Sequence, residues 1–310
     1  SLARARELIL GGELCAFPTE TVYGLGANAY LAESARKVYA AKGRPSDNPL
    51  IVHVNDSADA SLFAETNETY KKLAKQFMPG PLTVILPKKD VIPDEVTGGL
   101  RTVAVRCPSN PIARELIRRS GVPIAAPSAN LSGKPSPTCA EHVMQDMDGR
   151  IAMVIDGGEC EIGLESTVIA VSGNSANVLR PGAVTPDMLR SAGIAVTVDE
   201  AVTDPAKAGS APQSPGMKYK HYAPKAKTVI FSGAPEHVVS AICRRYDEQT
   251  AKGERVAILG LDEHRYGDRT FISLGSEKRP QEAAARLFAA LRDSIDRAVV
   301  LPEGYSMKVF

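Results

Sequence analysis

The sequence predicts an α/β protein in two parts, with a mixed, twisted open sheet in the larger part and a smaller C-terminal α/β domain. Strand-like and helical segments alternate irregularly over residues 1–202, which favours a mixed sheet over a purely parallel one. Residues 203–226 are rich in proline and glycine and lack apolar periodicity, so they are predicted to form a linker. A second alternation of strands and helices over residues 227–310 predicts the small domain.

Helix ends and apolar periodicity predict the individual elements. The opening helix should end at Gly11, because two successive glycines can supply a left-handed C-cap. Apolar residues from Leu31 to Tyr39 fall on one face of a helix that should end near Gly43. The nearly continuous apolar run over residues 50–54 is typical of a strand covered on both faces. Further helices are predicted over 111–119, 185–192, 237–246 and 281–295, and strands over 13–18, 83–86, 102–106, 122–126, 153–155, 167–171, 196–198, 228–231 and 256–259.

Composition argues against several classes of protein. The formal net charge is +1, so any anion site must come from a local cluster of basic residues rather than from a polycationic surface. Aromatic residues make up 5% and tryptophan is absent, which argues against platforms for stacking bases or sugars. The five cysteines form no C-x-x-C pair, so reduced thiols in the cytoplasm are expected rather than a zinc site or disulfides. No apolar run is long enough for a membrane span.

The common nucleotide and hydrolase motifs are absent from the sequence. No G-x-x-x-x-G-K-[ST] loop occurs, and Gly24-Leu25-Gly26 stops short of G-x-G-x-x-G. There is no G-x-S-x-G elbow and no H-E-x-x-H helix. A P-loop NTPase or a dinucleotide-dependent dehydrogenase is therefore not expected.

Small polar residues and lone basic residues recur at predicted strand and helix ends. Hydroxyls follow the first strand over residues 17–26, where a glycine-rich turn is expected to bring backbone close to a ligand. Two cations, Lys42 and Arg44, follow the next helix. Similar groups lie over residues 102–106, 126–133, 165–167 and 179–182. Serine, asparagine and arginine at such places suit the binding of phosphate oxygens and of a carboxylate.

These residues also have ordinary structural interpretations, which the sequence leaves open. A lone histidine in an apolar strand, such as His53, is commonly a satisfied core residue. Ser128 could simply cap a turn, and Lys42 and Arg44 could simply interact with the helix dipole. Arg106 could pair with a surface carboxylate.

Taken together, the motifs resemble the YrdC-domain family. The resemblance rests on Pro-Thr-Glu-Thr-Val-Tyr-Gly-Leu-Gly (18–26), Lys-Gly-Arg-Pro-x-x-x-Pro-Leu (42–50), Pro-Ser-Ala-Asn-x-Ser-Gly (127–133) and Ser-Thr-Val (166–168). The run over residues 214–224, followed by a small α/β domain, resembles the longer, two-domain form of this family. The match extends over nearly the whole chain.

The resemblance implies helices around a concave basic cavity and a reaction among ATP, L-threonine and bicarbonate (or CO2). The products would be threonylcarbamoyl-AMP and pyrophosphate. Threonylcarbamoyl-AMP would pass to the tRNA threonylcarbamoyltransferase machinery, which modifies an adenosine beside the anticodon, and a weak contact with RNA is conceivable. Mg²⁺ is expected to arrive with ATP rather than in a protein metal site, because it needs few protein ligands beside phosphates.

By motif position, the resemblance implies three sets of site residues. Expected ATP contacts are Arg44, Asn48, Thr102, Ser128, Ser136, Arg180 and Tyr222. Expected threonine contacts are Thr21, His53, Arg106, Ser166 and, through its backbone, Ala126. Positive charge for catalysis is expected from Lys42, Arg44 and Arg106. The linker run 214–222 resembles a lid that would exclude water from the labile product.

Two other functions compete with this interpretation. An RNA-binding module that grips a phosphate backbone would show strong salt dependence, but the near-neutral charge and scarce aromatics count against it. A carbamoyltransferase of the hydrogenase-maturation type shares the YrdC-like domain. That type should carry an acylphosphatase-like domain and cysteine-rich zinc motifs upstream, and this sequence contains neither.

Overall fold

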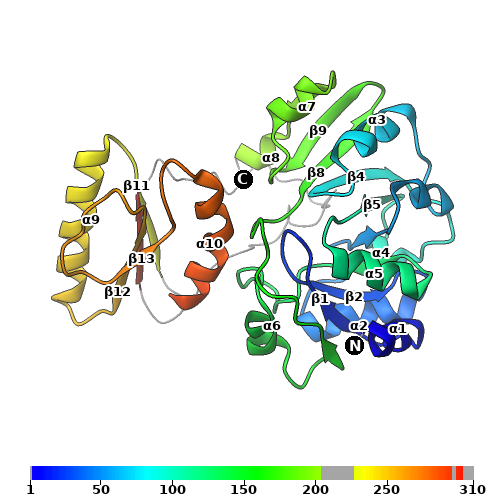
Figure 1. Ribbon diagram of the computed structural model, residues 1–310, viewed down its shortest axis with the longest axis horizontal. Helices are drawn as coiled ribbons and strands as arrows, with labels where there is room; N and C mark the ends of the chain where they lie inside the picture. Colours follow the sequence, from blue (N-terminus) through cyan, green and yellow to red (C-terminus); the bar gives the residue numbers. More distant parts are fainter. Residues whose placement is uncertain (1, 204–226, 295–297, 303–310) are drawn as a thin grey trace.

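The computed structural model describes residues 2–203, 227–294 and 298–302, which form two sheets with their own helices (Figure 1). We call the part built on the first sheet the large domain and the part built on the second the small domain. The predicted linker and lid lie outside the described residues, apart from Thr203, and so does Tyr222. The predicted division at residues 202 and 226 stays a prediction.

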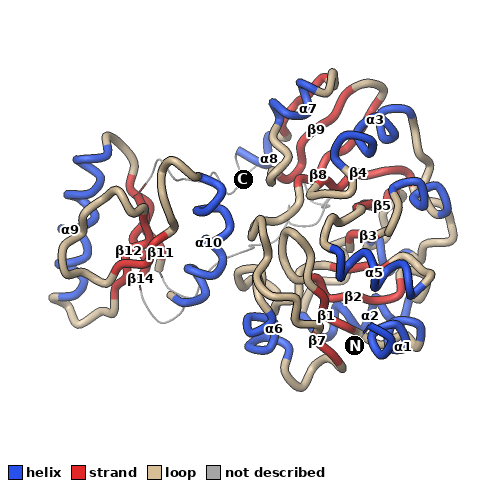
Figure 2. The backbone as a smooth tube through the Cα atoms, in the orientation of Figure 1, coloured by secondary structure: helices blue, strands red, loops and turns tan. Residues whose placement is uncertain are grey.

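Ten strands form the sheet of the large domain, and its helices flank them (Figure 2). The helices are α1 Leu2–Leu10, α2 Ala32–Lys42, α3 Glu68–Phe77, α4 Asp94–Thr97, α5 Pro111–Ser120, α6 Ala140–Met147, α7 Pro186–Ser191 and α8 Glu200–Thr203, with a 3-10 helix at Ser57–Leu62. The strands are β1 Cys15–Phe17, β2 Gly24–Asn28, β3 Ile51–His53, β4 Leu82–Pro87, β5 Thr102–Arg106, β6 Ile124–Ala126, β7 Met153–Val154, β8 Thr167–Ser172, β9 Ser175–Arg180 and β10 Ala195–Val198.

The large sheet is mixed, as the irregular alternation predicts. Its strand order is β10-β9-β8-β4-β5-β3-β6-β2-β1-β7. The central strand β3 runs parallel to β5 and antiparallel to β6, while β4 runs antiparallel to β5 and parallel to β8. Because neighbouring strands run both ways, loops that are distant in sequence meet at the same edge of the sheet.

Local capping explains where the predicted helices end. Helix α2 stops at Gly43, which has a left-handed φ of 59°, and α5 stops at Gly121, with a φ of 68°. Helix α5 begins with the Asn110 side chain accepting bonds from two backbone N–H groups, followed by proline at its first position. Both features satisfy backbone groups that a helix end leaves unpaired.

A glycine-rich turn was expected within residues 17–26, but Gly24 and Gly26 lie in β2. This strand pairs antiparallel with β1 and with β6. A Cβ on Gly26 would lie 2.8 Å from Cε1 of Phe17 and 3.0 Å from Cγ2 of Ile124. The glycine therefore allows close packing across the sheet rather than a turn.

The small domain is a four-stranded parallel sheet between two long helices. Its elements are β11 Thr228–Phe231, α9 Pro235–Thr250, β12 Val256–Gly260, β13 Phe271–Ser273, α10 Pro280–Asp293 and β14 Ala298–Pro302. The strand order is β11-β14-β12-β13, and each pairing is parallel. Figure 1 shows α10 on the side of this sheet that faces the large domain, with α9 on the opposite side. A parallel sheet covered by helices on both faces is the expected arrangement.

Candidate active site

Three arginines that are far apart in sequence converge on one cavity of the large domain. Arg44 follows α2, Arg106 ends β5 and Arg180 ends β9. The register explains part of this convergence, since His53 of β3 lies opposite Arg106 and Ile51 of β3 lies opposite Ala126 of β6. The cavity is lined by Thr19, Val22, Gly24, Arg44, Pro49, Ile51, His53, Arg106, Ala126, Pro127, Ser128, Glu165 and Arg180. This is a hollow with a cationic wall, as the sequence analysis expects.

Arg106 is buried in an ion pair with Glu20. One terminal nitrogen of the guanidinium donates to Oε1 of Glu20 over 2.8 Å, and both side chains are at most 4% exposed. Burial alone would raise the pKa of Glu20, but the charge and hydrogen bond of Arg106 hold that pKa below its usual value. The Nε atom of Arg106 is buried without a hydrogen-bond partner among the described residues. Buried donors normally have partners, so this edge of the guanidinium can receive a ligand anion.

Arg180 is held by Ser166, which directly precedes β8. Its Nε donates to the backbone carbonyl of Ser166 over 3.1 Å, and a terminal nitrogen donates to the Ser166 hydroxyl over 3.0 Å. That hydroxyl also bonds the hydroxyl of Thr83 over 2.7 Å. Glu165 lies 3.7 Å from Arg180 and accepts a bond from the Ser136 hydroxyl over 2.6 Å. Arg180 and these hydroxyls are thus fixed in one network.

Lys42 holds the loop that follows β6 instead of lining the cavity. It is 2% exposed, and its ammonium donates to the backbone carbonyls of Ser128 and Asn130. Burial lowers the pKa of Lys42 well below its usual value, and the charge of Arg44 lowers it further. Lys42 thus supports Ser128, which itself lines the cavity, and its expected role near the phosphates stays a prediction.

Arg44 and Asn48 lie in the turn between α2 and β3. The guanidinium of Arg44 donates to the backbone carbonyls of Asn48 and Pro49 over 3.2 and 3.0 Å. The side-chain amide of Asn48 is buried, and neither its nitrogen nor its oxygen has a hydrogen-bond partner among the described residues. An unsatisfied buried amide is costly, but Asn48 is not among the residues that line the cavity, so its contact with ATP stays a prediction.

His53 lies in the cavity wall as a neutral imidazole. Its Nδ1 lies 3.1 Å from the backbone carbonyl of Ile51, and its ring packs edge-on against Phe17. Burial and the neighbouring charge of Arg106 lower the pKa of His53 to about 3. His53 is thus a satisfied histidine that also lines the cavity, and its contact with threonine stays a prediction.

The depressed pKa of His53 predicts a pH-dependent stability. Between pH 6.5 and 4.5 the imidazole of His53 takes up a proton in the unfolded chain but stays neutral in the folded protein. The free energy of unfolding should therefore fall as pH falls. One proton contributes about 1.4 kcal/mol per pH unit. Chemical denaturation at several pH values gives the slope of the unfolding free energy against pH. This slope should differ by that amount between the wild type and His53→Gln. His237→Gln, at an exposed histidine, should keep the wild-type slope, and a wild-type slope in His53→Gln would contradict the prediction.

Four further predicted residues are likewise not among the residues that line the cavity. Thr21 is buried, and its hydroxyl lies 2.9 Å from that of Thr19, which does line the cavity. Ser136 reaches the cavity through Glu165. Thr102 begins β5, four residues before Arg106, and is half-buried. Ser166 acts through Arg180, as described above.

Two carboxylates of the site were not among the expected site residues. Glu20 stands inside the motif over residues 18–26, and Glu165 belongs to the group over residues 165–167. Carboxylates repel anions, so neither was expected at a site for anionic substrates. Their function becomes visible only with their partners, since Glu20 fixes Arg106 and Glu165 links Ser136 to Arg180.

The donor set of the cavity fits a magnesium ion carried by a nucleotide. The described residues contain no group of three histidine, cysteine, aspartate or glutamate side chains that could bind a metal ion. Glu165 does supply a carboxylate to the cavity wall. Mg²⁺ at a triphosphate keeps several waters and takes few protein ligands, so one carboxylate is sufficient.

Two family models together match nearly the whole chain. One, described as telomere recombination and covering the Sua5, YciO and YrdC proteins, matches residues 7–182. The other, described as the threonylcarbamoyl-AMP synthase C-terminal domain, matches residues 184–308. The chain belongs to the Sua5/YciO/YrdC family. The resemblance drawn from the motifs, including its two-domain form, is thereby confirmed.

Relatives within the Sua5/YciO/YrdC family match over almost their full length. The threonylcarbamoyl-AMP synthase of Bacillus subtilis is 48% identical, over 94% of this chain and 83% of the relative. That of Pyrococcus abyssi is 44% identical, over 98% of this chain and 88% of the relative. The crystal structure of P. abyssi Sua5 complexed with L-threonine superposes with a TM-score of 0.91 at 43% identity, covering 97% of this chain and 88% of that one.

Within the described residues, every helix is too short or too polar to cross a bilayer.

Proposed function

We propose that this chain is an L-threonylcarbamoyladenylate synthase, which converts L-threonine, bicarbonate (or CO2) and ATP into threonylcarbamoyl-AMP and pyrophosphate. The convergence of Arg44, Arg106 and Arg180 on one cavity is the observation that carries this proposal. Each substrate is anionic or has an anionic group, so a shared cationic hollow is what the reaction requires. Relatives of 44% and 48% identity carry the name of this enzyme.

The threonine end of the cavity is proposed to lie at Arg106. The unpaired Nε edge of its guanidinium can receive the carboxylate, while Glu20 holds the other edge. Thr21, His53, Ser166 and the backbone of Ala126 complete the proposed set around the amino acid. The threonine amine must lose its proton before it can capture CO2, and a neutral His53 adds no positive charge that would oppose binding of the ammonium form.

The nucleotide end is proposed to lie along Arg44, Ser128 and Arg180. Asn48, Thr102, Ser136 and Tyr222 are proposed as further ATP contacts, with Tyr222 outside the described residues. The carbamate oxygen attacks the α-phosphate while pyrophosphate leaves, so negative charge must be held at both ends of the transferring group. Fixed guanidinium groups provide this by positioning and electrostatic stabilisation, and no covalent nucleophile is required.

Mg²⁺ is proposed to enter with ATP and to rest mainly on phosphate oxygens, with Glu165 as the carboxylate within reach. When bound, it would neutralise charge on the triphosphate and on the leaving pyrophosphate. The protein's own part is to orient both substrates and to exclude water. The five free cysteines suit a reducing compartment, and we place the reaction in the cytoplasm, with the product passing to the tRNA threonylcarbamoyltransferase machinery.

Pyrophosphate release tests the proposal directly. The purified chain should release pyrophosphate from ATP only when L-threonine and bicarbonate are both present, and L-alanine serves as the control amino acid. Product formation can be followed by chromatography of threonylcarbamoyl-AMP. Pyrophosphate release that does not depend on threonine would reject the proposal. Tight, salt-sensitive RNA binding without pyrophosphate release would favour the RNA-binding alternative.

A further inference from the structure

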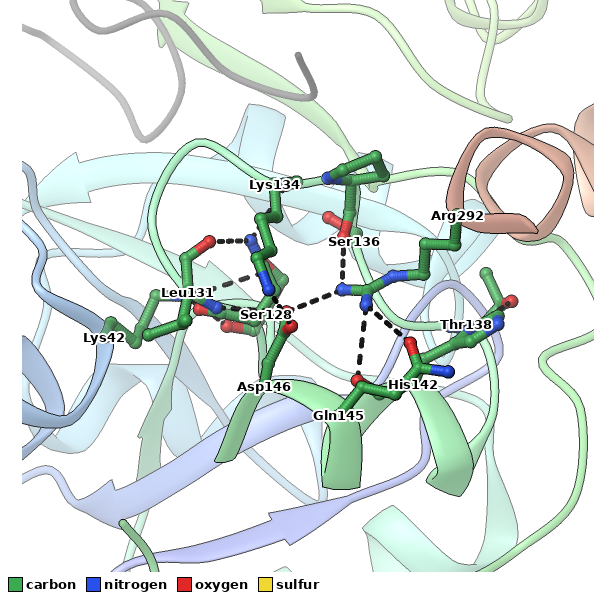
Figure 3. A network of polar contacts seen from close by, with 12 residues as sticks. Lys42, Ser128, Leu131, Lys134, Ser136, Thr138, His142, Gln145, Asp146 and Arg292 are labelled. Atoms are coloured by element: carbon green, nitrogen blue, oxygen red, sulfur yellow. Dashed lines mark hydrogen bonds and ion pairs between the residues drawn. The ribbon is translucent and has the colours of Figure 1, made fainter. Parts of the chain in front are cut away.

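Arg292 of the small domain is buried inside the large domain. It lies near the end of α10, and its side chain is 1% exposed. The guanidinium donates to Asp146 of α6 over 2.9 Å and to the backbone carbonyl of Pro135 over 2.6 Å. It also donates to the backbone carbonyl of His142 over 3.3 Å. Figure 3 shows this side chain entering the large domain from α10 and reaching several segments at once.

The groups that Arg292 contacts hold the loop over residues 128–136, which leads from the cavity. Asp146 is fully buried and also accepts a bond from Lys134 over 2.6 Å and from the backbone N–H of Leu131 over 3.2 Å. Figure 3 places Lys134, Asp146 and Arg292 in one connected set of contacts. Asp146 therefore fixes the position of the middle of this loop. Arg292 fixes the position of Asp146 and, through the Pro135 carbonyl, that of the end of the loop.

Both ends of this loop reach the nucleotide end of the cavity. Ser128 lines the cavity at the start of the loop, where Lys42 holds its carbonyl. Pro135, which accepts from Arg292, directly precedes Ser136, whose hydroxyl bonds Glu165 of the cavity wall. A shift of Pro135 would therefore move Ser136 and Glu165 as well.

The same helix packs against the other side of the cavity wall. Val22 lines the cavity and belongs to one apolar cluster with Leu287 and Leu291 of α10, against which Leu164 also packs. Gly163 lies so close to α10 that a Cβ there would be 2.4 Å from the backbone oxygen of Ala285. The contact between the domains is thus apolar at Val22 and close at Gly163, and Val22 itself lines the cavity.

We infer that Arg292 is a positioning residue for ATP: the small domain sets the loop over residues 128–136 through the Arg292 contacts to Asp146 and Pro135. This inference rests on the proposed function and gives the small domain a role in ATP binding. Threonine binding should depend on it much less, because Arg106 is held by Glu20 and not by this loop.

Kinetics of Arg292→Ala and Arg292→Lys test the inference. The lysine keeps a charge for Asp146 but cannot bond Asp146 and the Pro135 carbonyl in the same fork geometry. The KM for ATP should rise about tenfold or more in the lysine variant and further in the alanine variant, since small displacements at a site can cost up to about 100-fold. The KM for threonine should change less than about twofold, because the proposed displacement does not reach Arg106.

The control variant is Arg286→Ala, which removes an exposed arginine from the same helix and should leave both KM values unchanged. Circular dichroism and thermal unfolding establish which variants are folded, and the lysine variant serves if the alanine variant does not fold. Equal losses for ATP and threonine, or a wild-type KM for ATP in a folded variant, would overturn the inference. A wild type that shows no threonine-dependent pyrophosphate release would reject the proposed function instead, so the two failures are distinguishable.

Discussion

Replacing Arg106 by lysine should weaken L-threonine binding by about 100-fold while ATP binding changes little. The guanidinium uses one edge for Glu20, and its Nε edge is proposed for the threonine carboxylate. A lysine ammonium is a single point charge that would remain on the buried Glu20, so the second edge is lost. Hydrogen bonds to charged groups contribute about 1.5–3 kcal/mol each, and 1.4 kcal/mol corresponds to about tenfold in affinity. Calorimetry with threonine and with ATP measures both effects.

Lysine is preferred to alanine at this position because Glu20 would otherwise be left buried without a cation. Breaking a buried ion pair in that way typically costs about 3–5 kcal/mol of stability, which would obscure any effect on binding. Arg101→Lys is the matched control, since this exposed arginine directly precedes the same strand, β5. Unchanged threonine affinity in a folded Arg106→Lys protein would show that the carboxylate binds elsewhere.

The elements that could be predicted from the sequence are those whose signals are local. Helix α2 ends at Gly43 and α5 begins at Pro111 because the capping residues stand beside the helix they end or begin. Strand β2 was missed because its glycines suit a turn, and only the packing of Phe17 against Gly26 shows why they are in a strand. Strand β14 was missed for a similar reason: it inserts between β11 and β12, and no neighbouring segment indicates that position.

In the candidate site, too, the residues with local signals could be predicted and the contacts between distant segments could not. Arg44 and Arg106 could be expected at the site because they follow or end a predicted element, whereas the strand that ends at Arg180 was not predicted. The pairing of Arg106 with Glu20 spans 86 residues, and that of Arg292 with Asp146 spans 146 residues. No spacing within one segment can reveal such pairs, since the sheet topology and the contact between domains create them. The carbonyl partners of Lys42 could not be predicted for this reason, because they come from a distant loop.

Arg44→Ala should weaken ATP binding by about 100-fold and leave threonine binding within about twofold of the wild type. The guanidinium lines the cavity and is oriented by the carbonyls of Asn48 and Pro49, so its charge is held in place before the nucleotide arrives. Losing one or two charge-assisted bonds to phosphate accounts for an effect of this size, at about 1.5–3 kcal/mol for each bond. Isothermal calorimetry with ATP, and separately with threonine, provides the two affinities.

Arg36→Ala is the matched control for this variant, because Arg36 is an exposed arginine of α2 that pairs with Glu33. If Arg44 served only the helix dipole at the end of α2, its removal would lower stability by about 0.3–1 kcal/mol and leave both affinities unchanged. Loss of ATP and threonine binding to the same extent would instead mean that Arg44 shapes the whole cavity rather than its nucleotide end. A selective loss of ATP affinity is expected only if the cation contacts the nucleotide, because Arg106 keeps its own partner, Glu20, in the variant.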